Sequence, residues 1–149
     1  MDKRSQLKQG LHHLYLPYYE TLCALLPEEW LPYSGVRDIQ TQAELYARGR
    51  TQIGDKVTNS EPGYSAHNYG CATDWTIFKA GRPLWEHDRW PEYREACVKA
   101  GVDWGGEWSL MDKPHNQLRL ARSYRAIGSI YKNQGEQTAL AMIESLHKT

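Results

Sequence analysis

The chain has 149 residues, and its 18 Lys and Arg residues balance its 18 Asp and Glu residues, which gives a formal net charge of zero. The length suits one domain, and the even charge argues against a dedicated nucleic-acid-binding protein, which would carry a basic surface. No apolar run approaches the roughly 20 residues of a transmembrane helix, so we expect no stable membrane insertion. We also expect synthesis in the cytoplasm without a signal peptide, because the first residues lack an apolar core.

The chain has three cysteines, Cys23, Cys71 and Cys97. An odd number without any CxxC spacing describes neither a disulfide framework nor a zinc ribbon. We therefore expect reduced, mostly buried thiols, as is usual for a protein made in a cytosol.

The first fifty residues predict helices around one short strand. Leucines recur at helical spacing in the first segment, at Leu7, Leu11 and Leu14. This spacing predicts an amphipathic helix. Pro17 interrupts the pattern but suits the first turn of a second helix, which runs to Leu26. Residues 30–36 predict a strand, and residues 41–47 predict a helix that Gly49 ends in a left-handed conformation.

The middle of the chain predicts a loop followed by strands. Residues 51–63 are polar and rich in turn formers, which indicates a long loop of the kind that often serves function. Residues 64–68 and 71–78 predict strand pieces on either side of Gly70, and residues 79–82 predict a turn.

The last third of the chain predicts helices, a loop and a strand. Pro91 marks the first turn of one helix, and Gly101 marks its end. In chain order we expect a helix over 90–100, a loop over 104–108, a strand carrying His115, and helices over 118–130 and 137–146 on either side of Gly135. The chain has no internal repeat, low-complexity stretch or convincing linker. Residues 1–149 are therefore predicted to form a single α+β domain.

A candidate metal site lies in the segment from His67 to Asp74. Gly70 between them permits a tight reversal and Ala72 is small, so both side chains could face one ion. Neutral imidazole and carboxylate are natural zinc ligands, and a catalytic zinc needs a third protein ligand and an open position. The other four histidines, His12, His13, His87 and His147, need no special explanation.

The DKPH segment supplies that third candidate in His115, with Asp112 three residues before it. A metal ion lowers the pKa of water toward about 7, and a nearby carboxylate can take the proton and pass it to a leaving amine. By spacing alone an alternative stays open, in which both aspartates are turn residues and the histidines are structural.

Several ordered motifs make the chain similar to a known family. They are SGVR at 34–37, QAELYARGRT at 42–51, VTNS at 57–60, GYSAHNYG at 63–70, WGGEW at 104–108 and DKPH at 112–115. Together they resemble the M15 zinc peptidases, and most closely the L-alanyl-D-glutamate endopeptidases of phage endolysins and bacterial wall enzymes. The resemblance covers about residues 34–115 and leaves 116–149 as a helical C-terminal extension packed on the domain.

The resemblance implies a fold and a set of roles. The fold would be a small hedgehog/DD-peptidase-like domain, with a mostly antiparallel sheet and flanking helices. His67, Asp74 and His115 would bind one Zn²⁺ per chain. Asp112 would be the general base, and Arg37 would hold the developing oxyanion, an effect commonly worth a few kcal/mol.

Weaker assignments concern side chains that orient the ligands or line the groove, namely Ser65, Gln42, Trp104 and Trp108. The chain also departs from the family pattern at three positions. Asn116 stands where an aromatic residue is usual, and Thr73 and Cys71 stand at usually apolar sites. These departures put the packing behind the ligands in doubt.

The resemblance implies a monomeric zinc endopeptidase of the phage endolysin type that cuts peptidoglycan stem peptides, and the expected cleavage site is the L-Ala–D-Glu bond. It would act on the wall after release from the cytoplasm of a phage-infected host. One alternative keeps the chemistry but cuts D-Ala–D-Ala as a dipeptidase or carboxypeptidase. Another is a non-catalytic zinc-binding module of the same fold.

Overall fold

The computed structural model describes residues 2–147, so residues 1 and 148–149 of the expected domain lie outside the described residues. Its centre is a five-stranded sheet in which each strand pair is antiparallel, with the order β1-β2-β5-β4 and β3 paired to β2. The strands are β1 (Trp30–Ser34), β2 (Ala72–Lys79), β3 (Arg82–Leu84), β4 (Asp103–Trp104) and β5 (His115–Gln117).

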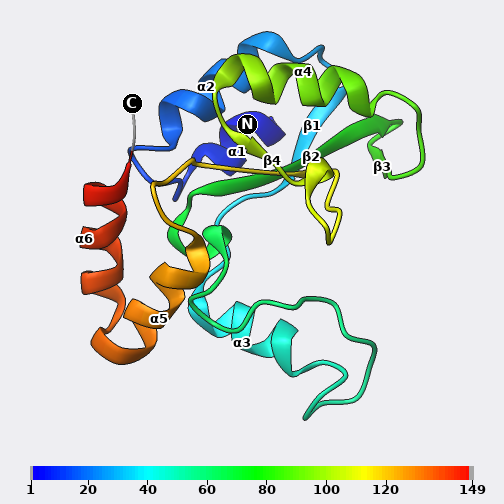
Figure 1. Cartoon of the computed structure of the whole chain (residues 1–149). Helices are drawn as coiled ribbons and strands as arrows, with labels where there is room; N and C mark the ends of the chain where they lie inside the picture. Colours follow the sequence, from blue (N-terminus) through cyan, green and yellow to red (C-terminus); the bar gives the residue numbers. More distant parts are fainter. Residues whose placement is uncertain (1, 148–149) are drawn as a thin grey trace.

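Helices cover both faces of this sheet (Figure 1). They are α1 (Lys3–Lys8), α2 (Leu16–Leu25), α3 (Ile39–Ala47), α4 (Trp90–Ala100), α5 (Tyr124–Gln134) and α6 (Glu136–Leu146), with short 3₁₀ helices η1 (Ala66–Tyr69) and η2 (Gly105–Glu107). Helices α2 and α4 lie over one face, whereas η1 and α5 lie on the other side (Figure 1). The predicted α+β class, with an antiparallel sheet and flanking helices, is confirmed.

Alternation along β2 separates the two faces of the sheet. Trp75 is fully buried, and its ring packs 5.7 Å from that of Tyr19 on α2. Because side chains alternate along a strand, the neighbouring Asp74 faces the other side, toward η1. The large apolar core therefore lies under α2 and α4, and the opposite face is free to carry polar groups.

Local signals explain the elements that were predicted well. Helix α4 spans the predicted residues, with Pro91 in its first turn and Gly101 at φ 84° after its last residue. Gly101 suits that left-handed position because it has no Cβ. Helix α3 begins after Asp38, whose carboxylate accepts a hydrogen bond from the backbone N–H of Thr41 at 2.7 Å.

The prediction of one long N-terminal amphipathic helix is wrong. Helix α1 ends at Lys8, and Gly10 follows with a left-handed φ of 83°. The backbone N–H of His12 donates to the carbonyl of Gly70 at 2.9 Å, a long-range bond that takes the chain out of the helical path. The leucine spacing therefore reflects burial without a continuous helix.

Two further boundaries differ from the prediction. Residues 64–68 are not a strand, because Ser65 and Asn68 cap each other's backbone N–H groups and start η1. Helix α5 begins at Tyr124, after the capping residue Ser123, and not at Leu118. The backbone N–H of Leu118 donates instead to the Cys71 carbonyl at 2.8 Å and extends the sheet region.

The cysteines behave as their spacing indicated. All three are free thiols; Cys71 and Cys97 are buried and Cys23 is half-buried. Burial raises the pKa of the Cys71 and Cys97 thiols to about 12. Over the described residues, no helix combines the length and apolar character that crossing a bilayer would require.

Candidate active site

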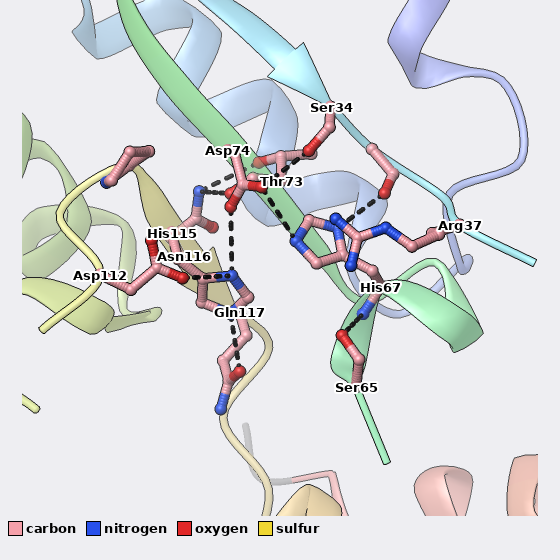
Figure 2. Close-up of polar contacts among 12 residues, drawn as sticks. Ser34, Arg37, Ser65, His67, Thr73, Asp74, Asp112, His115, Asn116 and Gln117 are labelled. Carbon is pink, nitrogen blue, oxygen red and sulfur yellow. Dashed lines mark hydrogen bonds and ion pairs between the residues drawn. The ribbon is translucent and has the colours of Figure 1, made fainter. Parts of the chain in front are cut away.

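Three side chains from separate segments meet on the polar face of the sheet (Figure 2). His67 lies on η1, Asp74 on β2, and His115 opens β5 directly opposite Asp74 in the strand register. His67 Nε2 is 3.2 Å from Asp74 Oδ2, and His115 Nδ1 is 3.1 Å from Asp74 Oδ1. One ligand atom from each residue lies within 4.8 Å of the others, a spacing at which the three could hold one metal ion.

Hydrogen bonds on the outer side of each ring decide which nitrogen is free. His67 Nδ1 lies 2.7 Å from the Gly35 carbonyl, and His115 Nε2 lies 2.8 Å from Gln117 Oε1. Because a carbonyl oxygen can only accept, each of these nitrogens carries the ring proton. The other nitrogen of each ring, His67 Nε2 or His115 Nδ1, therefore faces Asp74 and is the one that a metal ion could bind.

The electrostatics of the site favour a positive charge at its centre. Burial alone would raise the pKa of Asp74, yet His67 and His115 hold it well below its ordinary value. Burial likewise opposes charging His115, but the hydrogen bond and charge of Asp74 outweigh it and raise the pKa of that imidazole. An ionised carboxylate thus lies between two imidazoles, where a bound cation would replace a proton.

Asp112 lies beside the three residues on the segment between η2 and β5. Its Oδ2 is 3.9 Å from His115 Nδ1, and its side chain is half exposed. Burial of the other half raises the pKa of its carboxyl above the ordinary value. Gly105 permits this placement, because a Cβ there would come within 2.5 Å of the Asp112 carbonyl oxygen.

Arg37 lines the same cavity as Asp112, and Gln42 holds it in place. Arg37 Nη1 donates to Gln42 Oε1 at 3.0 Å, and Gln42 is fully buried. The Gln42 amide in turn donates to the Ser60 carbonyl at 2.7 Å. Gln42 therefore contacts the arginine and the 51–63 loop, whereas none of its hydrogen bonds goes to a candidate metal ligand.

The remaining predicted residues separate into two groups. Ser65 and Trp108 line the cavity; Ser65 Oγ accepts from the His67 backbone N–H at 3.3 Å, and the Trp108 ring lies 5.1 Å from the His115 ring. Trp104 does not line it, and its Nε1 donates to the Lys113 carbonyl at 2.7 Å. Trp104 thus stabilises the segment that carries Asp112.

The cavity has a volume of about 680 Å³ and opens to solvent. Its lining includes Tyr33, Arg37, Leu45, Val57, Thr58, Ser60, Tyr64, Ser65, His67, Asp74, Trp108, Asp112, His115, Gln117 and Tyr124. This volume falls in the range of about 300–1,000 Å³ that is usual for small-ligand sites. Val57, Thr58 and Ser60 of the long loop after α3 form part of the cavity wall.

Two contacts at the site were not found from the sequence. Ser34 Oγ donates to Asp74 Oδ2 at 2.7 Å, and Gln117 orients His115. Ser34 belongs to the SGVR motif, and Gln117 shares a strand face with His115 because it lies two residues further along β5. The sequence contains both residues, but their contacts with Asp74 and His115 could be inferred only once the strand register was known.

The unusual residues behind the ligands form a buried hydrogen-bonded network. Thr73 and Asn116 are paired across β2 and β5, and the Asn116 amide donates to Thr73 Oγ1 at 3.0 Å and to Tyr93 Oη at 2.7 Å. Tyr15 Oη donates to Asn116 Oδ1 at 2.6 Å. Polar residues at these core positions are therefore satisfied, and within residues 2–147 no buried side-chain nitrogen or oxygen lacks a partner.

A His-Asp-His set, with a carboxylate and an arginine beside it in an open cavity, is an arrangement typical of metallohydrolases. Residues 58–118 match a peptidase M15 family model described as D-alanyl-D-alanine carboxypeptidase. This match confirms, over residues 58–118, the resemblance to the M15 peptidases found in the sequence. M15 peptidases are metallopeptidases, and the three clustered residues could bind a metal.

Two relatives are similar to the chain. It is 38% identical over 95 residues to the peptidoglycan L-alanyl-D-glutamate endopeptidase CwlK of Bacillus subtilis (strain 168), a match that covers 56% of this chain and 57% of that protein. The crystal structure of the Serratia marcescens L-Ala D-Glu endopeptidase ChiX matches with a TM-score of 0.56 and 24% identity, covering 90% of this chain and 91% of that one. The second comparison shows a shared fold.

Proposed function

We propose that the chain is a zinc-dependent peptidoglycan endopeptidase that hydrolyses stem peptides at the L-Ala–D-Glu bond. The observation that carries the proposal is the convergence of His67 Nε2 and His115 Nδ1 on the Asp74 carboxylate, inside a cavity that Asp112 and Arg37 also line. Two imidazoles and one carboxylate form a donor set that suits catalytic zinc. The choice of bond rests on the names of the similar proteins CwlK and ChiX.

His67, Asp74 and His115 would hold the zinc ion. When bound, zinc polarises a carbonyl oxygen and lowers the pKa of water toward about 7. Outer hydrogen bonds to the Gly35 carbonyl, Gln117 and Ser34 fix the orientation of the three ligands. Such outer partners keep a metal site from rearranging during turnover.

Asp112 would act as the general base and then as the general acid. Its carboxylate takes a proton from the attacking water and returns it to the amine that leaves when the amide C–N bond breaks. Burial raises the pKa of the Asp112 carboxyl, so this pKa lies closer to neutral pH than that of a fully solvated aspartate. The distance of 3.9 Å between Asp112 Oδ2 and His115 Nδ1 supports this role.

Arg37 would stabilise the oxyanion that forms on the scissile carbonyl. Its guanidinium is always charged, and the bond from Nη1 to Gln42 leaves other N–H donors available. A preorganised donor at this position commonly contributes about 2.7–4 kcal/mol in the transition state. Ser65 and Trp108 on the cavity lining would contact the bound peptide.

A second candidate keeps the same chemistry and changes the substrate. The matching family model is described as D-alanyl-D-alanine carboxypeptidase, which favours release of a terminal D-alanine as the alternative. The non-catalytic alternative is less favoured, because Asp112 and Arg37 are both in place beside the three clustered residues.

Digestion of defined peptidoglycan, with and without a chelator, tests the proposal. New D-glutamate amino termini, formed only when metal is present, would support cleavage after L-alanine. Released free D-alanine would establish the carboxypeptidase alternative. Absence of any new terminus in a folded, zinc-loaded preparation would leave only the non-catalytic alternative.

We also propose a role in host-cell lysis, of the phage endolysin type. The motif resemblance includes phage endolysins as well as bacterial wall enzymes, so this finer assignment needs its own test. The chain can be expressed inside a bacterium and the inner membrane then permeabilised chemically. Rapid lysis that requires both permeabilisation and Asp112 would support an endolysin, and intact cells would count against it.

A further inference from the structure

A second cluster of metal-binding side chains lies outside the cavity. His12 and His13 occupy the segment between α1 and α2, and Glu144 lies in the last turn of α6. One ligand atom from each of these residues lies within 4.8 Å of the others. Figure 1 shows the end of α6 beside the segment that joins α1 to α2. None of the three residues lines the candidate active-site cavity.

The Nε2 atoms of both imidazoles in this cluster lie near the same carboxylate oxygen. His13 Nε2 contacts Glu144 Oε1 directly, and His12 Nε2 lies 3.6 Å from that oxygen. The two rings are stacked, with centroids 4.7 Å apart and an interplanar angle of 23°. The three possible ligand atoms are therefore already close together in the metal-free structure.

The cluster is fixed on one side and open on the other. The His12 side chain is 8% exposed and its backbone N–H donates to the Gly70 carbonyl at 2.9 Å, whereas the His13 side chain is 70% exposed. The Glu144 side chain is 45% exposed. An ion bound here could complete its coordination with water on the exposed side.

We infer that His12, His13 and Glu144 form an accessory binding site for a zinc ion that joins the N-terminal segment to α6. Two imidazoles and a carboxylate suit zinc better than calcium or magnesium, which prefer all-oxygen ligands. The chain would then bind two zinc ions in place of the single ion expected from the sequence, one at each of its two clusters. This inference does not depend on the proposed peptidase activity.

The accessory site should bind zinc less tightly than the buried cluster. His12 Nδ1 accepts a hydrogen bond from the Leu14 backbone N–H at 3.1 Å. Zinc on Nε2 would place the ring proton on Nδ1 and break this bond, whereas both outer nitrogens of the buried cluster already donate to oxygen. Zinc should therefore fill the His67–Asp74–His115 cluster first.

Zinc binding to the full-length chain tests the inference. Equilibrium dialysis against zinc alone, followed by metal analysis, should give two ions per wild-type chain, with the second binding more weakly. His13→Ala and Glu144→Gln should each reduce the content to one ion. Glu136→Gln, an exposed residue at the other end of the same helix, should keep both and serves as the matched control.

Two results would overturn the accessory site: a single ion in the wild type at saturating zinc, or two ions retained in both His13→Ala and Glu144→Gln. Retention of the tight ion shows that each variant is folded around its buried cluster. Peptidoglycan hydrolysis by His13→Ala should equal that of the wild type, so failure of the accessory site and failure of the proposed activity are distinguishable.

Discussion

Gln117 Oε1 accepts a hydrogen bond from His115 Nε2 at 2.8 Å, from a position two residues further along the same strand. This contact directs Nδ1 of His115 toward Asp74, so a side chain outside the candidate ligand set orients one of the candidate ligands. Ser34 plays a comparable part for the carboxylate through its 2.7 Å bond to Asp74 Oδ2.

Replacement of Gln117 with Ala should weaken zinc binding at the buried cluster by roughly 10–100-fold, because loss of an outer partner frees the imidazole to rotate or change tautomer. Competition with a chromophoric chelator measures the change. Gln137→Ala, on the exposed part of α6, is the control and should bind zinc as the wild type does. Equal affinities for the two variants would contradict the orienting role of Gln117.

Asp112→Asn should preserve zinc binding and lower the rate of hydrolysis by roughly 100–10,000-fold, the usual contribution of a general base. The amide has nearly the same shape but cannot take a proton from water. Metal content and turnover should be measured on the same preparation, with Asp55→Asn in the exposed loop as the control. Near-normal turnover in Asp112→Asn would remove this residue from the mechanism.

Arg37→Lys should lower kcat by about 100–1,000-fold and change KM less, because the guanidinium acts mainly on the transition state. A lysine keeps the charge but cannot donate to Gln42 and to an oxyanion in the same fixed geometry. Arg82→Lys, on exposed β3, is the matched control. If only KM rises, Arg37 binds the substrate uniformly and is not an oxyanion donor.

Asn116→Ala should destabilise the fold by roughly 1–3 kcal/mol, because it removes hydrogen bonds from the buried Tyr15 and Tyr93 hydroxyls. Denaturant unfolding of the metal-free protein measures the loss without interference from zinc. Asn133→Ala on exposed α5 should have little effect. An unchanged midpoint for Asn116→Ala would show that the network behind the ligands contributes nothing to stability.

Cys71 and Cys97 should resist thiol reagents at pH 8 in the native protein. Their thiol pKa values are raised to about 12 by burial, so the reactive thiolate is scarce until the pH approaches that value. Unfolding in denaturant should expose both to rapid reaction. Fast modification of either residue in the folded chain would contradict its burial.

Local signals predicted much of the fold. Pro91 lies in the first turn of α4 and Gly101 directly follows its last residue, so the helix could be placed without tertiary information. The N-terminal segment could not, because the bond from the His12 backbone to Gly70 joins residues far apart in the sequence. Residues 64–68 were wrongly predicted as a strand. The 3₁₀ helix η1, which Ser65 and Asn68 cap, is only four residues long, and such a short helix shows no helical periodicity in the sequence.

The candidate ligands were found from motifs, whereas their supporting contacts were not. The resemblance to the M15 peptidases grouped His67, Asp74 and His115 as candidate ligands, but the role of Gln117 depends on which strand face it shares with His115. From the sequence, Asn116 was a departure that put the packing in doubt. The strand register pairs it with Thr73, another polar residue. Sequence patterns thus identify residue types for chemistry, and the register of the sheet determines which neighbours orient them.

Anomalous diffraction at the zinc absorption edge, from crystals grown with zinc, tests the central claim most directly. The account predicts a peak bonded to His67 Nε2, His115 Nδ1 and a carboxylate oxygen of Asp74, at about 2.0–2.2 Å from each. Zinc bound elsewhere in the molecule, with these three side chains making no contact to it, would contradict the account.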